Sequence, residues 1–443
     1  MAKIMRVLEH STLSIGDEQS GVKFEVKHWH QLFRYRDEKS ANRFYDMRHD
    51  GVRFRSYVGV IQTGDLTIEI LPKVDDVNVA SDQTMAKWRD ILLRMLHESG
   101  TLNLDSLTNA FLHEKENSLL DIYLELFLNE VEKLLHRGLV KRYRHTEGQQ
   151  SALRGAIQFS KHISQNLTHQ ERFYTRHQTY DQQHLHNQLI RQALLLLPRL
   201  TNSFTLRGRT ARALLQWAEA PVLKVTAATF ARLSYDRKTE AYRPAIVIAR
   251  LLLLHHRPDI RGGNNDLIAL LFNMNQLWEK YLLRTLRRLS SSYDCTVVKP
   301  SYSTLWKAEN GTISKMQPDI LITAPGKRNI VLDAKWKRPK GLPSEVDLRQ
   351  LYTYAHYYDA THAVLLYPHT DYVSAVSGKF QQPEHLPACK PDDLIVCSTV
   401  FVQIGKGNSL GTDGDYDSLG YLHCTLESEF KNWLGSGSTI SIL

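Results

Sequence analysis

Met316-Gln-Pro-Asp-Ile-Leu-Ile-Thr323 and Ile330-Val-Leu-Asp-Ala-Lys335 are two short apolar segments separated by a turn sequence that contains Pro and Gly. Runs of Ile, Val and Leu around such a turn are typical of a β-hairpin. Pairing the two strands about the turn places Asp319 roughly opposite Asp333 and Ala334. Because side chains alternate faces along a strand, Asp333 and Lys335 point the same way. The sequence therefore predicts two carboxylates and one ammonium group together at the end of an apolar hairpin.

Carboxylates on an apolar hairpin are costly to bury unless a partner neutralises them. Mg²⁺ is a suitable partner, since it takes oxygen ligands and usually only one or two protein carboxylates. We expect Asp319 and Asp333 to bind Mg²⁺, for which Mn²⁺ can substitute, with the backbone carbonyl of Ala334 as a further ligand. Lys335 beside the metal could orient or deprotonate a water and offset phosphate charge. The pattern resembles the Pro-Asp…Asp-x-Lys motif of restriction-endonuclease-like nucleases. The alternative is a surface ion pair, since Asp-x-Lys also arises by chance.

Composition indicates an ordinary globular protein with a basic surface. The chain has 443 residues and a formal net charge of +9, which favours a polyanionic partner. It contains no run of about 18 apolar residues and no apolar signal core, so we expect no membrane association. Its four cysteines form no Cys-x-x-Cys pair. These features predict a cytoplasmic protein with reduced thiols.

We expect an α+β multidomain fold that begins with a β-rich N-terminal domain over residues 1–145. Segments 53–61 and 66–71 flank a Gln-Thr-Gly-Asp turn and have the alternating pattern of a second hairpin. Helical spacing of apolar residues predicts two helices, at 84–97 and 119–137.

A helical, basic middle region is expected over residues 146–262, because the composition becomes polar at 147–154. Helices are predicted at 186–197 and 242–256. Basic residues interleaved with aromatic ones could follow a nucleic-acid backbone, although a solvated basic face would have the same composition. These residues are Arg154, Lys161, Arg172, Phe173, Tyr174, Arg176, His177, Arg207, Arg209 and Arg212.

Residues 263–443 are expected to form an α/β domain with a C-terminal extension, after a linker at 261–265. Ser344 and Asp347 are spaced as a helix capping box. The predicted order of helix, strand, strand pair, helix and strand is similar to the αβββαβ core of the Pro-Asp…Asp-x-Lys nucleases. The predicted elements are a helix at 267–289, a strand at 295–299, the hairpin, a helix at 344–358, and strands at 362–367 and 394–404.

Three further residues are candidates for the same site. Glu279 lies on the helix before the hairpin, from which nucleases of this resemblance commonly add a metal-binding carboxylate; the alternative is an exposed ion pair. Gln350 and Tyr354 share one face of the following helix. Gln-x-x-x-Tyr resembles the element that lines the site in exonuclease-like members, although a plain polar helix would look alike. The basic run 335–340 is a further candidate for phosphate contact.

Several elements together resemble the McrC family, the nuclease subunits of modification-dependent (type IV) restriction systems. They are Leu66–Lys73, Leu153-Arg-Gly155, Met274–Glu279, Gln317-Pro-Asp319 and Asp333-Ala-Lys335. The resemblance covers about residues 50–370 and implies a cytoplasmic Mg²⁺-dependent endonuclease that cuts double-stranded DNA containing methylcytosine. It also implies a partner, a McrB-like AAA+ GTPase hexamer, which the N-terminal part engages and stimulates.

Two other functions remain open. One is a stand-alone DNA repair or recombination nuclease, which Gln350 and Tyr354 would suit. The other is a non-catalytic adaptor that only docks on a motor. No phosphate-binding loop is visible, because none of the Gly-Lys pairs has the required Gly five residues earlier. We therefore expect this chain to bind no nucleotide.

Overall fold

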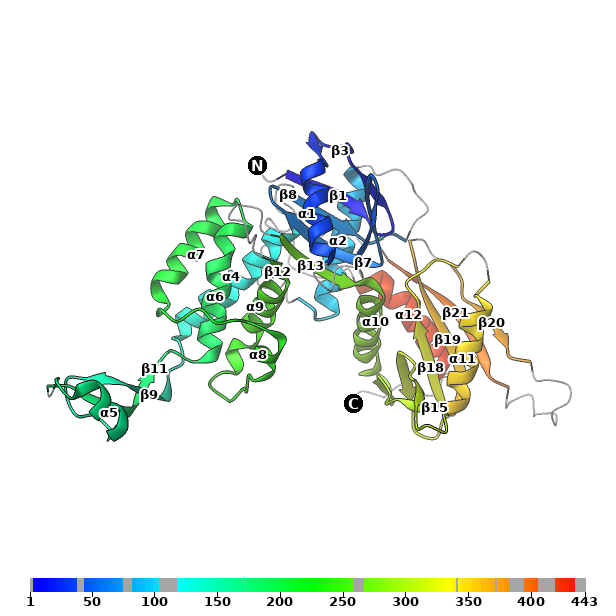
Figure 1. Ribbon diagram of the computed structural model, residues 1–443. Coiled ribbons are helices and arrows are strands. Elements are labelled where there is room, and N and C mark those ends of the chain that lie inside the picture. The colour runs from blue at the N-terminus through cyan, green and yellow to red at the C-terminus, as the bar shows by residue number, and fades with distance from the viewer. Residues whose placement is uncertain are drawn as a thin grey trace. The chain divides into compact units, whose positions relative to one another are not determined.

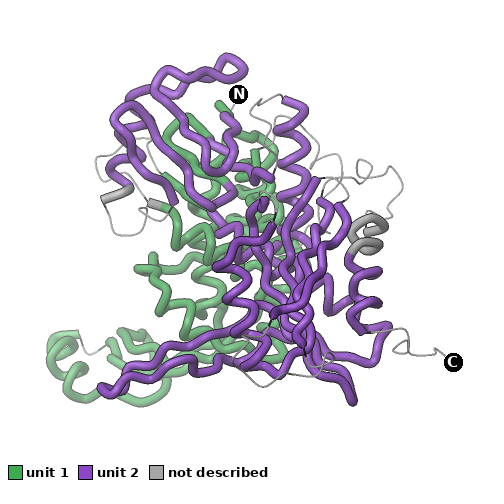
Figure 2. Tube along the Cα trace, turned by 90° about the vertical axis from the view of Figure 1, so that its right-hand side faces the viewer, with its two compact units in different colours: residues 1–4, 60–67, 106–270 green, residues 5–59, 68–105, 271–443 purple. Residues whose placement is uncertain are grey.

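The structure, a computed structural model, divides the chain into two compact units, coloured separately in Figure 2. It describes residues 3–37, 44–74, 82–102, 118–169, 171–257, 267–339, 342–370, 373–381, 394–404 and 419–434. Unit 1 comprises Met1–Ile4, Val60–Thr67 and Ser106–Leu270, and unit 2 comprises Met5–Gly59, Ile68–Asp105 and Leu271–Leu443. Unit 2 therefore contains residues of both the predicted N-terminal and the predicted C-terminal domains. The linker expected at 261–265 lies outside the described residues.

The N-terminal part of the chain is rich in strands, as predicted. The hairpin expected before residue 72 forms between β7 (Tyr57–Thr63) and β8 (Leu66–Leu71), and every residue of β8 is buried. With β1 (Lys3–Leu8), β13 (Leu267–Asn273) and β12 (His256–Arg257) they give the strand order β1-β8-β7-β13-β12. The remaining elements are β2 (Thr12–Ser14), β5 (Tyr45–Arg48) and β6 (Gly51–Phe54) in one sheet, β3 (Glu18–Gln19) with β4 (Val22–Lys23), and helices α1 (Val26–Asp37) and α2 (Asp82–Glu98).

Unit 1 is built on helices, and those predicted at 119–137, 186–197 and 242–256 all form. They are α4 (Leu119–Arg137), α6 (Leu185–Leu200) and α9 (Arg243–His255), joined by α7 (Phe204–Gln216), α8 (Ala227–Ala231) and η2 (Glu240–Tyr242). A capping box between Ser118 and Asp121 starts α4, and Gly138 at φ 81° ends it.

Unit 1 also contains a sheet that the sequence did not predict. Strand β9 (Arg142–Gln150) pairs along its whole length with β11 (Phe173–Asp181), and β10 (Ala156–Ile157) adds to β11. Together with α5 (Phe159–Asn166) this sheet extends away from helices α4, α6 and α9 of the same unit (Figure 1). The domain boundary expected at residue 145 falls inside β9.

A six-stranded sheet in unit 2 carries the predicted hairpin. Its order is β14 (Thr296–Val298), β17 (Ile320–Thr323), β18 (Asn329–Ala334), β19 (Ala360–His369), β21 (Val396–Gln403) and β20 (Val376–Lys379). Strands β18, β19 and β21 are parallel to one another, whereas β14, β17 and β18 alternate in direction. Helix α10 (Met274–Ser290) packs on β14 and β18, α11 (Glu345–Tyr357) on β18 and β19, and α12 (Leu419–Leu434) on β21. The predicted elements follow one another in the predicted order α10, β14, β17, β18, α11, β19. The sequence did not predict β15 (Ser303–Lys307) and β16 (Ile313–Met316), which come between β14 and β17, or β20.

Three local predictions need correction. The helix expected from residue 267 begins only at Met274, because the apolar run before it forms β13, which periodicity alone does not distinguish from a helix. Met316 belongs not to the first hairpin strand but to β16 (Ile313–Met316), which pairs with β15 (Ser303–Lys307). Ser344 caps α11 by accepting from the Asp347 amide at 3.2 Å, so one of the two bonds of the expected capping box forms. The Asp347 carboxylate contacts the Ser344 side chain, Lys337 and Tyr367 rather than the Ser344 amide.

Candidate active site

The hairpin register brings the predicted carboxylates together. Ile320 pairs with Leu332 and Ile322 with Ile330, so that Asp319 lies opposite Asp333, as expected. The Ala334 amide donates to Asp319 Oδ2 at 2.8 Å, and Asp333 is only 3% exposed. It is thus the amide of Ala334 that the structure directs at Asp319; its carbonyl as a metal ligand stays a prediction.

The two carboxylates lie in an environment that opposes their ionisation. Burial, the charge of Asp333 and the charge of Glu279 raise the pKa of Asp319 to about 7. Burial likewise raises the pKa of Asp333, whose side chain contacts both Asp319 and Lys335. Adjacent buried carboxylates cannot both ionise cheaply without a nearby cation. A cation in addition to Lys335 would favour the ionised form of both carboxyl groups.

Lys335 is surrounded by acceptors. Its Nζ lies 2.7 Å from Asp333 Oδ2, donates to Gln350 Oε1 at 2.9 Å, and lies 4.0 Å from Asp347 Oδ1. Burial alone would lower the pKa of Lys335, but the surrounding carboxylates, Asp333 foremost, raise it overall. These acidic neighbours favour the charged form of Lys335.

Helix α11 holds the lysine in place. Gln350 and Tyr354 share one helix face, as predicted, and Gln350 Nε2 donates to Tyr354 Oη at 2.6 Å. The Gln350 amide thus bridges Tyr354 and Lys335, which fixes the orientation of its oxygen. Tyr354 is 7% exposed, so the bridge is anchored in the core.

Glu279 on α10 acts on the carboxylate pair electrostatically. Its carboxylate contributes to the raised pKa of Asp319. Its carboxylate also forms an ion pair with Lys299, whose Nζ lies 3.4 Å away. Lys299 is 20 positions further along the chain. Glu279 therefore has both features that the sequence suggested: an ion pair with a lysine and an electrostatic effect on the carboxylate pair.

Asp347, which the sequence predicts only as part of a helix cap, also belongs to this region. It binds Lys337 Nζ at 2.6 Å and accepts from Tyr367 Oη at 3.1 Å. The basic run 335–340 is consequently not a uniform phosphate-binding segment, since Lys337 is neutralised and Trp336 is buried. Lys340 lies outside the described residues. No local sequence signal could have shown that the Asp347 carboxylate turns toward these partners.

The donor set fits a two-carboxylate Mg²⁺ site. Within the described part of the chain, no group of three or more His, Cys, Asp or Glu side chains is arranged to hold a metal ion. Mg²⁺ needs fewer protein ligands than that, because it keeps several waters. The pKa of Asp319 is raised although Lys335 lies beside the pair, because burial and the neighbouring carboxylates outweigh the charge of the lysine. Asp319 and Asp333 are thus the residues that would hold the ion.

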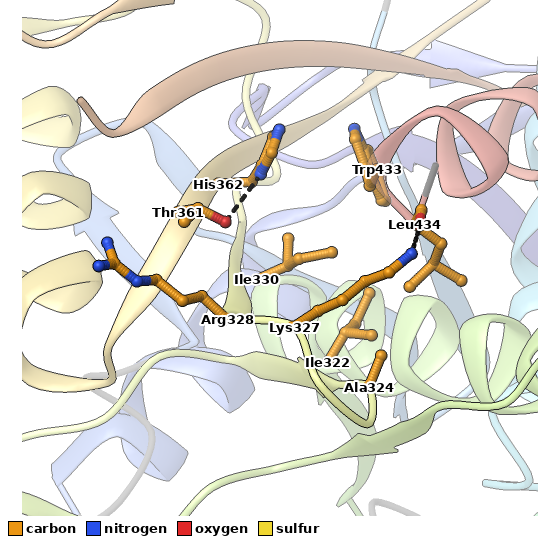
Figure 3. A pocket seen from close by; sticks show the side chains of 9 residues that line it. All are labelled: Ile322, Ala324, Lys327, Arg328, Ile330, Thr361, His362, Trp433 and Leu434. Atoms are coloured by element: carbon orange, nitrogen blue, oxygen red, sulfur yellow. Dashed lines mark hydrogen bonds between the residues drawn. The ribbon is translucent and has the colours of Figure 1, made fainter. Parts of the chain in front are cut away.

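A cavity of about 390 Å³ opens at the other end of the hairpin, near its turn (Figure 3). It is lined by Ile322 of β17 and Ile330 of β18, with Trp433 of α12 and His362 of β19. Figure 3 shows Lys327 pointing to the Leu434 carbonyl, to which it donates a hydrogen bond. None of the predicted site residues lines this cavity, so it is separate from the carboxylate pair.

Some of the basic residues suggested for DNA contact have structural partners. Arg209 binds Glu125 at 2.5 Å and Glu132 at 2.8 Å and ties α7 to α4. Lys161 pairs with Glu147 at 2.8 Å. For these two residues the structure supplies a role within the fold.

Comparison with known proteins gives a family, and McrBC complexes are among the solved structures that this chain resembles. The family model described as "McrBC 5-methylcytosine restriction system component" matches residues 52–368. A half-complex of Thermococcus gammatolerans McrB AAA+ hexamers with bound McrC, from a tetradecameric assembly, is similar with a TM-score of 0.67 and 17% identity, covering 96% of this chain and 100% of that one. The cryo-EM structure of the McrBC complex from the same organism gives a TM-score of 0.47 and 17% identity, covering 65% and 88%. No curated protein matches the chain. None of the described helices is long and apolar enough to cross a membrane.

Proposed function

This chain belongs to the McrBC 5-methylcytosine restriction system component family, and we propose that it is the DNA-cleaving, McrC-type subunit. It hydrolyses phosphodiester bonds in double-stranded DNA that contains methylcytosine. The observation that carries the proposal is the joining of Asp319, Asp333 and Lys335 at the end of one hairpin, with Gln350 holding the lysine.

Each residue of the site has a chemical role in this proposal. Asp319 and Asp333 would hold Mg²⁺, which would supply Lewis-acid polarisation of a phosphoryl oxygen and of the attacking water. Lys335 places a fixed positive charge beside the attacked phosphate, where negative charge grows in the transition state. Gln350 orients Lys335, and Tyr354 orients Gln350. Glu279 adds negative charge that strengthens metal binding.

The order of elements supports the same proposal. Helix α10, strands β14, β17 and β18, helix α11 and strand β19 follow the αβββαβ order of the restriction-endonuclease-like nucleases. The carboxylates lie on the central hairpin, where the Pro-Asp…Asp-x-Lys motif of that superfamily is found. We therefore propose that residues 263–443 form such a nuclease domain.

A partner motor completes the proposed function. The sequence contains no phosphate-binding loop, so this chain does not itself power movement along DNA. The similar T. gammatolerans structure contains McrB AAA+ hexamers with bound McrC. We propose that this chain likewise acts in the cytoplasm with a McrB-like GTPase hexamer, and that residues 1–145 contact the motor and stimulate its hydrolysis.

The first test is a set of single substitutions assayed with the partner and saturating Mg²⁺. Asp319→Ala, Asp333→Ala and Lys335→Ala should each lower the cleavage rate by at least about 10²-fold, because each removes a metal ligand or the charge beside the phosphate. The matched control is Glu345→Ala on α11, whose carboxylate forms an exposed ion pair with Arg349. Parental cutting by any of the three folded site variants would rule out this site.

The same assay separates the other two functions. A motor adaptor would stimulate GTP hydrolysis by the partner without any metal-dependent cutting. A stand-alone repair nuclease, which the Gln350–Tyr354 hydrogen bond would suit, would cut without the partner.

A further inference from the structure

A buried carboxyl from the N-terminal part of unit 2 contacts the residue after Lys335. Glu9, which follows β1, has no exposed surface, and its Oε1 accepts from Trp336 Nε1 at 2.6 Å. The two residues are 327 positions apart in the sequence. A contact of this kind joins the β-rich N-terminal part directly to the segment that carries the proposed catalytic lysine.

The backbone of the Leu66–Lys73 segment fixes Glu9. The Glu9 amide donates to the Leu71 carbonyl at 2.8 Å, and the Lys73 amide donates to Glu9 Oε1 at 3.0 Å. Both partners belong to the Ile-Leu-Pro-Lys sequence. Glu9 Oε1 therefore accepts from Lys73 and Trp336 at once, and cannot move without breaking one of these bonds.

Trp336 in turn lies against the frame of the proposed site. Its ring packs edge-on against Trp278, with centroids 5.4 Å apart, and Trp278 precedes Glu279 on α10. The Trp278 indole donates to the Leu366 carbonyl at 3.3 Å, and the Lys335 amide donates to the same oxygen at 3.0 Å. A shift of Trp336 would therefore disturb the backbone at Lys335 and the helix that carries Glu279.

Burying the Glu9 carboxyl costs free energy, and filling space in the core would not require a carboxyl at this position. Burial raises the pKa of Glu9 to about 7, and its Oε2 makes no hydrogen bond within the described chain, with His10 Nε2 3.8 Å away. Apolar side chains of similar volume are often as stable as, or more stable than, buried charged groups, so a carboxyl here is better suited to fixing geometry.

We propose that Glu9 is a positioning residue of the nuclease site: through the Trp336 indole it holds Lys335 and α10 in register, so that the N-terminal part completes the site. This inference rests on the proposed function. Glu9 touches neither the proposed metal ligands nor the reacting phosphate. Its effect should therefore fall on the rate of the chemical step rather than on DNA affinity.

The test uses the full chain, in which the seven tryptophans are replaced by 5-fluorotryptophan. Trp336→Phe identifies the ¹⁹F signal of Trp336. Glu9→Ala should shift that signal and, in the partner-containing assay, lower the single-turnover cleavage rate by about 10-fold or more at unchanged DNA affinity, as expected for a small misplacement of a catalytic group. Glu9→Gln should restore most of the parental ¹⁹F signal and cleavage rate, because an amide oxygen can also accept the hydrogen bonds from Lys73 and Trp336.

A matched control is available in the same sheet. Glu69 on β8 is equally buried but binds Arg6 at 2.9 Å. Glu69→Ala should lower thermal stability while leaving the Trp336 signal and the rate per folded molecule unchanged. If Glu9→Ala fails to fold, Trp336→Phe, which keeps a ring but loses the N–H donor, should show the same loss of rate.

The inference is overturned if Glu9→Ala leaves the Trp336 signal or the cleavage rate as in the parent, or if Glu9→Gln is as impaired as Glu9→Ala. Failure of the proposed function would look different. In that case Asp333→Ala would cut at the parental rate, whatever the Trp336 signal did.

Discussion

At the scale of single residues, the site is defined by the way one cation and several carboxylates share a partly buried space. Lys335 compensates Asp333 at 2.7 Å, but Asp319 is left with an amide hydrogen bond and two like-charged neighbours. One ammonium therefore cannot neutralise the whole group. The remaining negative charge is what a divalent cation would compensate in the proposed nuclease site.

Glu279 offers a test of this charge balance. Glu279→Gln removes one negative charge near Asp319 and should shift the Mg²⁺ midpoint of cleavage several-fold upward, as expected for a loss on the order of 1 kcal/mol. DNA binding should change less. The measurement is a Mg²⁺ titration of cleavage beside a DNA-binding isotherm. Glu309→Gln, on the exposed turn between β15 and β16, is the control. An unshifted midpoint would mean that Glu279 only forms an ion pair with Lys299 and has no part in metal binding.

Residue contacts also show what sequence reasoning could reach. Asp319 and Asp333 were predictable, because a turn of known position fixes the pairing of two adjacent strands. Gln350 and Tyr354 were predictable as neighbours, because four residues make about one helical turn. Asp347 with Lys337 and Glu9 with Trp336 were not, because these contacts depend on how separate segments pack, which no local period encodes.

At the scale of elements, the pairing of strands β10 and β11 explains why the Leu153-Arg-Gly155 sequence ends in glycine. Gly155 has φ +75° and precedes β10, and a Cβ placed there would lie 2.4 Å from the Arg176 carbonyl oxygen and 2.9 Å from the His177 Cα. Backbone atoms of β11 cannot give way as a flexible side chain would. A side chain at this position therefore conflicts with the pairing of β10 and β11.

Gly155→Ala should open this strand pair. The left-handed conformation alone costs an L-residue about 1–2 kcal/mol, and the backbone overlap adds to that. Hydrogen exchange of the β10 and β11 amides should become faster, while α4 and α6 keep their protection. Gly148→Ala on β9, where nothing lies within 4 Å of the added Cβ, should have little effect. Equal protection in the two variants would contradict this explanation.

The element-scale errors have physical reasons as well. The apolar run 267–273 is compatible with either a buried strand or the start of a helix, and only its pairing in a sheet decides between them. Strand β9 has no buried residue and four of its nine residues are exposed, so that it contains Arg, His, Glu and Gln and has the composition of a linker. Polar strands of this kind are the hardest to recognise from composition.

At the scale of the whole molecule, the chain is a mixed α/β multidomain protein in which unit 2 combines N-terminal and C-terminal segments. Sequence order could not show this, because the strands and helices that meet in unit 2 are separated by nearly all of unit 1. The order of the hairpin, helix α11 and strand β19 was predictable, since turn or cap signals bound them, whereas the short exposed strand β20 was not predicted. The division into three domains stays a prediction.

The proposed function carries a constraint at this scale. A Mg²⁺ site able to cut DNA would be harmful in the cytoplasm unless it receives substrate only when a partner presents it. This chain has no phosphate-binding loop to power that step. We therefore expect it to be a poor nuclease alone, and residues 1–145 to raise the GTP hydrolysis of the partner.

The most direct measurement is cleavage of a methylcytosine-containing plasmid by the purified full chain with Mg²⁺, with and without its cognate AAA+ partner and GTP. An Asp333→Ala chain and an unmethylated plasmid serve as controls. The predicted result is that only the parental chain with partner, GTP, Mg²⁺ and methylated DNA cuts efficiently, and that chelating the metal stops the reaction. Efficient cutting of unmethylated DNA by this chain alone, or equal cutting by Asp333→Ala in the complete mixture, would contradict the proposed function.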